Sequence, residues 1–224
     1  MKIDKRKNYY LTIDTETCGD IKEQNMLAYD IGGAIHDKQG NIYETFSFVI
    51  YDIFVLEVQK MVTCYYADKL GIYTNDLKNG TRKMVSLEYA RNYINELCKQ
   101  YNVKAICAYN ARFDWVTLKN TSKHTAGKNY FYPYGIELWD TWKMAKDTIC
   151  KQKNYERFCI ENDFLTKHKK PQLKTSAEVV YRYMLNDPDY KESHTGLEDV
   201  MIEIEIFSRC MRQHKKMRRL LFEK

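Results

Sequence analysis

Apolar residues change their spacing partway along this chain, and that change restricts the folds open to it. Residues 9–14, 28–36 and 42–51 are rich in strand-forming side chains. The last two segments flank HDKQGN, a turn sequence ending in Gly40, which predicts a β-hairpin. From Ser86, which fits an N-cap, the apolar residues recur at helical spacing. The chain therefore begins with strands and continues with at least one amphipathic helix.

Short strands and helices alternate after this point. VKAICAY at 103–109 is typical of a buried strand, and residues 111–120 follow it with helical spacing. GIELWD at 135–140 fits another strand, with a helix predicted from Thr141, and helices dominate from about residue 174. This order predicts an α/β domain whose mixed sheet is covered by helices.

The last helix has the clearest start. Thr195 and Glu198 fit a capping box, in which each side chain would accept a bond from a backbone N–H of the first turn. One apolar stripe follows, made of Leu197, Val200, Met201, Ile204 and Phe207.

The composition fits a single globular domain covering residues 1–224. Of its 224 residues, 44% are apolar and 29% charged, which excludes a disordered, collagen-like or disulfide-stapled chain. The formal net charge is +6, from 36 basic and 30 acidic residues. This mild surplus permits a nucleic-acid partner without requiring one.

The expected compartment follows from the cysteines and the apolar runs. Seven cysteines without a CxxC pair argue against a zinc site and for thiols in a reducing compartment. Acidic and polar residues interrupt the N-terminal apolar run, so no signal peptide is expected. No stretch approaches the roughly 18 apolar residues of a membrane span. We therefore expect a cytoplasmic protein with no membrane partner.

Two acidic residues lie at the end of the first strand. Asp14 and Glu16 stand two positions apart in LTIDTETCGD. Alternate residues of a strand point to the same face, so both carboxylates should project together. A divalent cation relieves their repulsion, and oxygen ligands of this kind suit Mg²⁺ or Mn²⁺. The alternative is a pair of solvated acids at a strand end.

Two later segments carry further titratable residues. Asp114, in AICAYNARFD, follows a buried strand and starts a helix, where α/β sheets place their sites. Its alternative role is a first-turn acid favoured by the helix dipole. His194 and Asp199 lie at the start of the last helix, and histidine suits general-base work near neutral pH. Their alternative is an ordinary polar helix start, and Glu198 is assigned to the capping box alone.

Taken in order, DTETCG, NARFD and HTGLED make this sequence resemble the DEDDh 3′–5′ exonucleases, the DnaQ-like branch of the ribonuclease-H-like superfamily. In that family the first motif carries two acids, which fall here on Asp14 and Glu16. The Asp of the second motif falls on Asp114, and the third motif falls on His194 and Asp199. The resemblance covers nearly the whole chain and implies an α/β fold, a ribonuclease-H-like mixed five-stranded sheet flanked by helices.

Two positions depart from the family pattern. Gly196 replaces the usual Ala of the third motif, which keeps the position small. Tyr109 stands where a His often precedes the Asn of the second motif. Neither change removes an expected metal ligand.

The resemblance implies two-metal-ion hydrolysis of phosphodiester bonds at 3′ ends, releasing 5′-mononucleotides. Asp14, Glu16, Asp114 and Asp199 would hold two Mg²⁺ ions, or Mn²⁺, about 3.5–4 Å apart. His194 would accept the proton of the attacking water.

The resemblance also sets expectations for partners. Thr15 and Thr17 would lie near the terminal nucleotide. Single-stranded DNA is favoured over RNA, although the motifs do not distinguish the two sugars. A homodimer or a polymerase partner is left open.

Basic residues gather in two other places. The C-terminal helix end, about 209–224, and the cluster at 167–170 are candidate phosphate contacts, and the first fits a solvated helix end equally well. Two alternative functions remain, an RNA 3′-end exonuclease and a non-catalytic nucleic-acid-binding or polymerase-associated subunit. The complete set of four acids and a histidine argues against the second.

Overall fold

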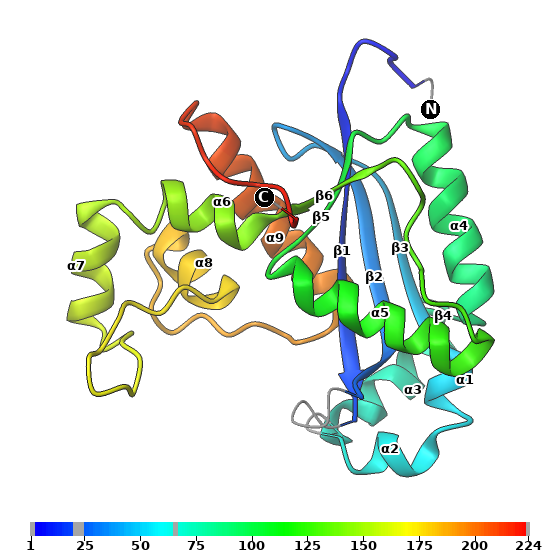
Figure 1. Ribbon diagram of the computed structural model, residues 1–224. Coiled ribbons are helices and arrows are strands. Elements are labelled where there is room, and N and C mark those ends of the chain that lie inside the picture. Colours follow the sequence, from blue (N-terminus) through cyan, green and yellow to red (C-terminus); the bar gives the residue numbers. More distant parts are fainter. Residues whose placement is uncertain (1–2, 20–24, 65–66, 223–224) are drawn as a thin grey trace.

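The computed structural model describes residues 3–19, 25–64 and 67–222 (Figure 1). Their strands form one mixed sheet in the order β4-β3-β2-β1-β5-β6. The strands are β1 Tyr9–Cys18, β2 Leu27–Asp37, β3 Ile42–Ile50, β4 Lys83–Val85, β5 Ala105–Ala108 and β6 Glu137–Asp140. β1, β2 and β3 pair antiparallel, whereas β5, β6 and β4 pair parallel to their neighbours. The predicted α/β class and the hairpin are confirmed.

The predicted number of five strands is wrong, because the sheet has six. The additional strand, β4, is only three residues long and pairs with the end of β3 at the sheet edge. Three residues are too few to show an alternating pattern, so only the pairing with β3 identifies this segment as a strand.

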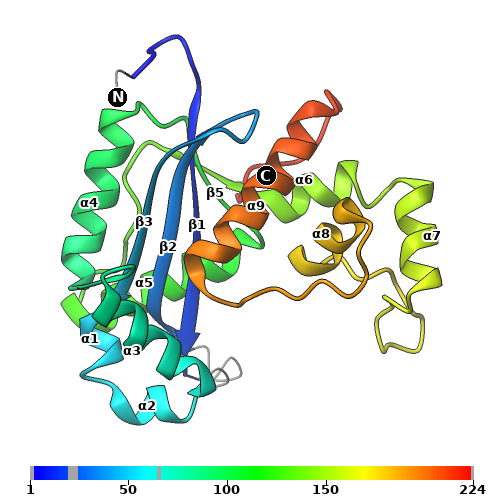
Figure 2. The ribbon, with the colours of Figure 1, turned by 180° about the vertical axis from the view of Figure 1, so that it is seen from behind.

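Helices cover both faces of the sheet (Figures 1 and 2). The helices α4 and α5 lie on one face, and α9 crosses β1 and β2 on the other, next to α6 and α8. The longer helices are α3 Leu70–Asn79, α4 Leu87–Gln100, α5 Ala111–Ala126, α6 Thr141–Thr148, α7 Lys153–Glu161, α8 Ala177–Leu185 and α9 Gly196–Arg212. None of the described helices is long and apolar enough to cross a membrane.

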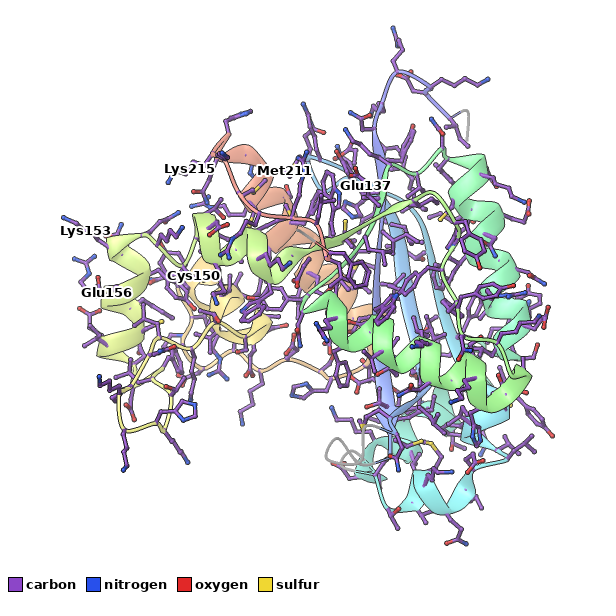
Figure 3. The ribbon with its side chains drawn as sticks, viewed as in Figure 1. Glu137, Cys150, Lys153, Glu156, Met211 and Lys215 are labelled. Carbon is purple, nitrogen blue, oxygen red and sulfur yellow. The ribbon has the colours of Figure 1, made fainter. Side chains whose placement is uncertain are left out.

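The described residues between β3 and β4 form α3 and three short elements. The short elements are α1 Tyr51–Phe54, α2 Val58–Val62 and a 3₁₀ turn Ala67–Lys69. Figure 1 shows this segment at the carboxyl end of β1. No helix is predicted from the sequence here or at α7, which stands at the far side of α6 with Lys153 and Glu156 pointing outward (Figure 3).

Of the two helix caps predicted from the sequence, one is confirmed and one is wrong. Ser86 caps α4 as predicted, since its Oγ accepts a bond from Tyr89 N at 3.2 Å. Thr195 is the N-cap residue of α9 but makes no side-chain bond to the helix backbone. Its Oγ1 instead donates to Glu198 Oε2 at 2.7 Å. The predicted capping box is therefore wrong, because Glu198 is turned toward Arg82, 2.8 Å away.

The C-terminal basic stretch is also different from the prediction. The helix α9 ends at Arg212, and the chain then returns to the sheet, where Asp140 N donates to Arg219 O at 2.7 Å. Leu221 N donates to Leu138 O at 2.8 Å. Residues 219–221 thus pair with β6 at the sheet edge instead of continuing the helix, and residues 223–224 lie outside the described part.

The start of α9 lies directly on the backbone of β2. A Cβ added to Gly32 would fall 2.2 Å from the backbone carbon of Gly196 and 2.2 Å from Leu197 N. A Cβ on Gly196 would fall 2.8 Å from Gly32 N. Two facing glycines therefore allow a helix-to-strand approach that no larger residue permits at Gly32.

Gly32→Ala should lower the free energy of unfolding by about 1–3 kcal/mol or more, because the added methyl group meets backbone atoms that cannot rotate away. The urea midpoint measures the effect. Gly71→Ala in α3 is the matched control, since nothing lies within 4 Å of its added Cβ. In a helix that change should stabilise by up to about 1 kcal/mol. Equal midpoints for the two variants would contradict the close contact.

Candidate active site

An open cleft lies at the carboxyl end of β1. Its volume is about 910 Å³, and β1, α9, α8 and the loop before α9 contribute to its walls. The residues that line it are Asp14, Thr15, Glu16, Thr17, Gly19, Asn25, Met26, Lys60, Thr63, Tyr109, Phe113, Ala177, Glu192, His194, Asp199 and Glu203. Six of the seven residues predicted for the site are among them, and Asp114 is not.

Three of the predicted acids come together in this cleft. One carboxylate oxygen each from Asp14, Glu16 and Asp199 lies within 4.8 Å of the other two. Asp14 and Glu16 point to the same face of β1, where their cross-strand partners are Gly32 and Asp30. The first turn of α9, seated on that same face, adds Asp199.

Burial raises the pKa of every one of these carboxyl groups. Burial raises the pKa of Glu16 to about 9, with the charge of Asp199 as the next cause. Burial likewise raises the pKa of Asp199 to about 7. For Asp14, burial comes first and the charges of Glu203 and Asp114 follow, so its pKa lies well above the ordinary value. The protein alone does not supply enough positive charge for these acids to ionise together.

Asp114 lies beside this group without joining it. Its carboxylate is buried, and Oδ1 accepts a bond from Thr15 Oγ1 at 2.8 Å. Burial raises its pKa to about 7. Thr15 and Thr17 both line the cleft, as expected for residues near a substrate, but the Thr15 hydroxyl is already directed at Asp114.

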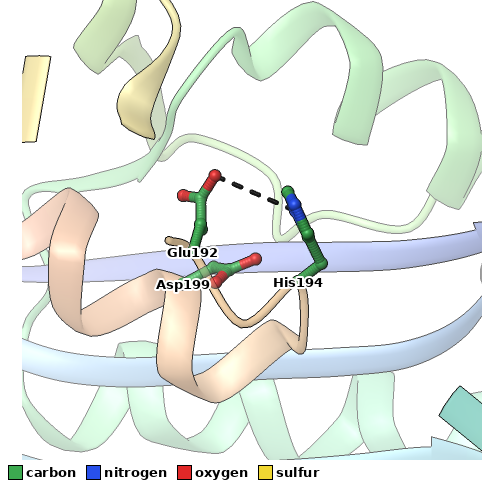
Figure 4. A group of neighbouring side chains, drawn as sticks. All are labelled: Glu192, His194 and Asp199. Atoms are coloured by element: carbon green, nitrogen blue, oxygen red, sulfur yellow. Dashed lines mark ion pairs between the residues drawn. The ribbon is translucent and has the colours of Figure 1, made fainter. Parts of the chain in front are cut away.

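His194 lines the cleft and lies just before α9 (Figure 4). Its backbone is left-handed, with φ of +53°, a conformation that non-glycine residues seldom adopt. Its Nδ1 lies 3.9 Å from Glu192 Oε2, and both residues share a group of possible ligands with Asp199. Burial, and then the charge of Lys69, lower the pKa of His194. The imidazole is therefore neutral at neutral pH and able to accept a proton.

Two acids of the cleft were missed by the sequence interpretation. Burial raises the pKa of Glu192 to about 8. Glu203 is buried, its pKa is raised well above the ordinary value by burial and the charge of Asp114, and its Oε2 accepts a bond from Tyr109 N at 3.1 Å. Glu203 follows Asp199 by one helical turn, so its place on the same face of α9 was a usable signal. Glu192 lies in a loop and gave no such signal.

Cations approach the cleft from the segment between β3 and β4. Lys60 of α2 lines the cleft and also pairs with Glu57. Lys69 Nζ donates to the backbone oxygens of Ser193 and His194, the latter at 3.3 Å. The charge of Lys69 lowers the pKa of the acids nearby, including Asp199. This segment therefore supplies positive charge beside the carboxylates, which is not predicted from the sequence.

The basic C-terminal stretch lies elsewhere. Lys215 follows the end of α9 opposite to the end that carries Asp199 (Figure 3). A helix of 17 residues spans about 25 Å, which separates the two ends. Two of its arginines have structural partners, since Arg218 pairs with Asp147 at 2.8 Å and Arg219 lies 4.4 Å from the Trp139 ring.

The cleft fits a divalent cation by the chemistry of its donors. The atoms that face it are carboxylate oxygens, which Mg²⁺ and Mn²⁺ prefer over nitrogen or sulfur. Their raised pKa values indicate a deficit of positive charge that a divalent ion would remove. Asp14, Glu16 and Asp199 are the residues that could hold it.

No protein-family model matches the sequence, and no curated protein matches it either. Solved structures do match the fold. Cell-death related nuclease 4 (CRN-4) is 13% identical, with a TM-score of 0.61 over 94% of this chain and 66% of its own. A 3′-exonuclease described for 3′-end specific recognition of histone mRNA stem-loop is 12% identical, with a TM-score of 0.62 over 98% of this chain and 69% of its own.

A third match has a longer chain. Exonuclease I of E. coli, in complex with a 5cy-dT13 oligonucleotide, is 15% identical, with a TM-score of 0.52 over 89% of this chain and 39% of its own. The present chain thus spans about two thirds of the first two proteins and less of the third. At these identities the likeness concerns the fold, and it confirms the fold implied by the resemblance to 3′–5′ exonucleases.

The metal-free protein should lose stability as pH rises from about 6.5 to about 9. Glu16, with its pKa raised from 4.5 to about 9, keeps a proton in the folded state that the unfolded chain has already lost. Stability then falls by up to about 1.4 kcal/mol per pH unit for such a group. His36 has the opposite effect on stability at lower pH. Burial lowers its pKa from 6.5 to about 4, so stability rises with pH between these two values, below the range given for Glu16.

Thermal unfolding in EDTA across this pH range tests the prediction. Glu16→Gln should flatten the slope, whereas Glu96→Gln, at an exposed pair on α4, should keep it. Added Mg²⁺ should raise the midpoint more at pH 8.5 than at pH 6.5, since protons no longer compete for the oxygens. An identical slope in wild type and Glu16→Gln would refute the assignment.

Proposed function

We propose that this protein is a metal-dependent 3′–5′ exonuclease that releases 5′-mononucleotides from nucleic-acid 3′ ends. The observation that carries the proposal is the group of Asp14, Glu16 and Asp199 in one cleft, which His194 also lines. The fold shared with nucleases supports it. Asp114 belongs to the proposed ligand set by its motif, and a small movement from Thr15 would release its carboxylate.

The residues of the chain have distinct roles in this proposal. Two divalent cations, Mg²⁺ or Mn²⁺, would acidify the attacking water and neutralise charge on the phosphate. Asp14, Glu16, Asp114 and Asp199 hold these ions. His194 accepts the proton of the water as its oxygen bonds to phosphorus and the bond to the leaving 3′ oxygen breaks. Thr15 and Thr17 lie beside the terminal nucleotide.

The cleft is suited to a single strand whose end can enter it. Its walls carry the carboxylates of Asp14, Glu16 and Asp199, and Phe113 and Tyr109 are aromatic residues of the same lining. Aromatic side chains stack on bases of either sugar type. A single strand is therefore the proposed substrate, and stacking does not distinguish the two sugars. We propose DNA as the first candidate and RNA 3′ ends as the second, which the likeness to a nuclease described for a histone mRNA stem-loop favours.

The proposed cellular location rests on the cysteines. Buried thiols such as those of Cys98 and Cys107 fit a reducing, cytoplasmic compartment. A homodimer and a polymerase partner are both compatible with the proposed reaction. A non-catalytic binding subunit is disfavoured, since such a protein does not need a cleft that brings together the carboxylates of Asp14, Glu16 and Asp199 with His194.

Digestion of end-labelled oligonucleotides tests the function. Single-stranded DNA, duplex DNA and RNA are compared with Mg²⁺, with 5′ label to follow shortening from the 3′ end. We expect single-stranded DNA to be shortened fastest and EDTA to stop the reaction. Asp14→Ala and Asp199→Ala should abolish turnover and retain the fold, whereas Glu96→Ala should match the wild type. Wild-type rates in either site variant would sink the two-metal assignment.

His194→Ala should lower kcat by roughly 10²–10⁴-fold, because the attacking water loses its proton acceptor. Oligonucleotide binding should change much less, since the proposed cation ligands Asp14, Glu16 and Asp199 stay in place. The pH–rate profile checks the role, because the variant should lose the limb due to the imidazole. His124→Ala, at an exposed pair with Glu57, serves as the control. An unchanged profile would remove His194 from catalysis.

A further inference from the structure

Arg82 is a buried cation outside the cleft that bonds to four separate elements. Its side chain is 3% exposed. Nη1 donates to Asp30 of β2 at 3.2 Å and to Ser47 of β3 at 2.7 Å. Nε donates to Asp76 of α3 at 2.9 Å, and Nη2 donates to Glu198 of α9 at 2.8 Å. Four of the five N–H donors of the guanidinium are therefore engaged.

Two of these bonds converge on the first turn of α9. Asp30 Oδ2, which accepts from Arg82, also accepts from Gly196 N at 3.0 Å. Glu198 Oε2, which also accepts from Arg82, accepts from Thr195 Oγ1 at 2.7 Å. Arg82 thus bonds to Glu198 in the first turn of α9 and to Asp30, which also accepts a bond from the Tyr73 hydroxyl at 2.8 Å.

Hydroxyl groups continue this chain of contacts to Asp199. Thr195 Oγ1 lies 3.1 Å from Ser193 Oγ, and Ser193 Oγ lies 3.3 Å from Asp199 Oδ1. Because Thr195 gives its one proton to Glu198, Ser193 is the group that can donate to Thr195 or Asp199. The backbone adds a bond from Asp199 N to Thr195 O at 3.0 Å. The position of Asp199 is therefore tied to that of Glu198.

Neutralising the buried charge of Asp30 explains only part of this arrangement. The side chain of Glu198 is 52% exposed, so it needs no buried counter-charge. The Nη2 bond instead joins the helix α9 to the segment that contains α3, over a sequence separation of 116 residues. A planar guanidinium can hold such acceptors in fixed directions, which a lysine cannot.

We propose that Arg82 is a positioning residue for the reaction: through Asp30 and Glu198 it orients the first turn of α9 and sets the carboxylate of Asp199 for cation binding. This inference rests on the proposed function, since Asp199 is a ligand only in that proposal. It assigns Arg82 and Glu198 an effect on cation affinity although neither lines the cleft.

Glu198→Ala is the decisive variant, because it cuts the link between Arg82 and α9 at a half-exposed side chain. Binding of Mn²⁺ to the full chain is measured by electron paramagnetic resonance, and kcat and KM are measured on the same preparations. We expect Mn²⁺ affinity and kcat to fall by about 10- to 100-fold, as for other partners of metal ligands, with KM for the oligonucleotide little changed. Glu198→Gln, which keeps an acceptor for Arg82, should recover much of the loss.

Two further variants complete the experiment. Arg82→Gln should reproduce the Mn²⁺ effect, and if it fails to fold because Asp30 is left unpaired, Glu198→Ala carries the test alone. Arg157→Gln, at an exposed pair on α7, should behave as wild type. A folded Glu198→Ala protein with wild-type Mn²⁺ affinity and kcat would overturn the positioning role.

The Mn²⁺ measurement separates this inference from the proposed function. A wild-type protein that binds Mn²⁺ but digests no nucleic acid contradicts the exonuclease, and the affinity difference in Glu198→Ala still decides the role of Arg82. A wild-type protein that binds no Mn²⁺ overturns both, because there is then no site for Arg82 to organise.

Discussion

The contact between the backbone of β2 and the start of α9 sets the geometry of everything around the cleft. Gly32 and Gly196 face one another with no room for a side chain at Gly32, and Asp30 accepts the first free backbone N–H of the helix. A helix seated this low on the sheet brings Asp199 level with Asp14 and Glu16 of the neighbouring strand. The same contact needs a buried carboxylate, which Arg82 neutralises. Site and scaffold therefore share one set of interactions.

Burial of like charges is the second constraint, and it gives the cleft its chemical character. Ordinary surface acids repel one another weakly because water surrounds them, but these carboxyl groups are desolvated and close together. Their pKa values rise until several stay protonated near neutral pH. Lys69 offsets part of this repulsion, and a divalent cation would offset the remainder. The cleft is destabilising by itself, as expected for a site built to hold a ligand.

Predictions from the sequence were correct where residues close together in the chain determine the structure, and wrong where distant residues determine it. Strands and helices with local periodicity, such as β2 and α4, lie where the spacing put them, and Ser86 caps its helix because that bond reaches only three residues along the chain. The capping box at Thr195 had an equally good local pattern, yet Arg82 draws Glu198 away from it. The strand β4 exists only because it pairs with β3. Long-range contacts therefore determine the conformation of Glu198 and the presence of β4.

The sequence by itself determined the α/β class, the hairpin and the cap of α4, and it placed four acids and a histidine in three segments in a fixed order. These features depend on neighbours a few residues away, so a linear pattern carries them. The tertiary structure alone decided that Asp14, Glu16 and Asp199 share a cleft while Asp114 bonds to Thr15, and that Glu192 and Glu203 join the same wall. It alone decided which cations face the acids. Such contacts join residues far apart in the chain, and their energies depend on burial, which no local pattern specifies.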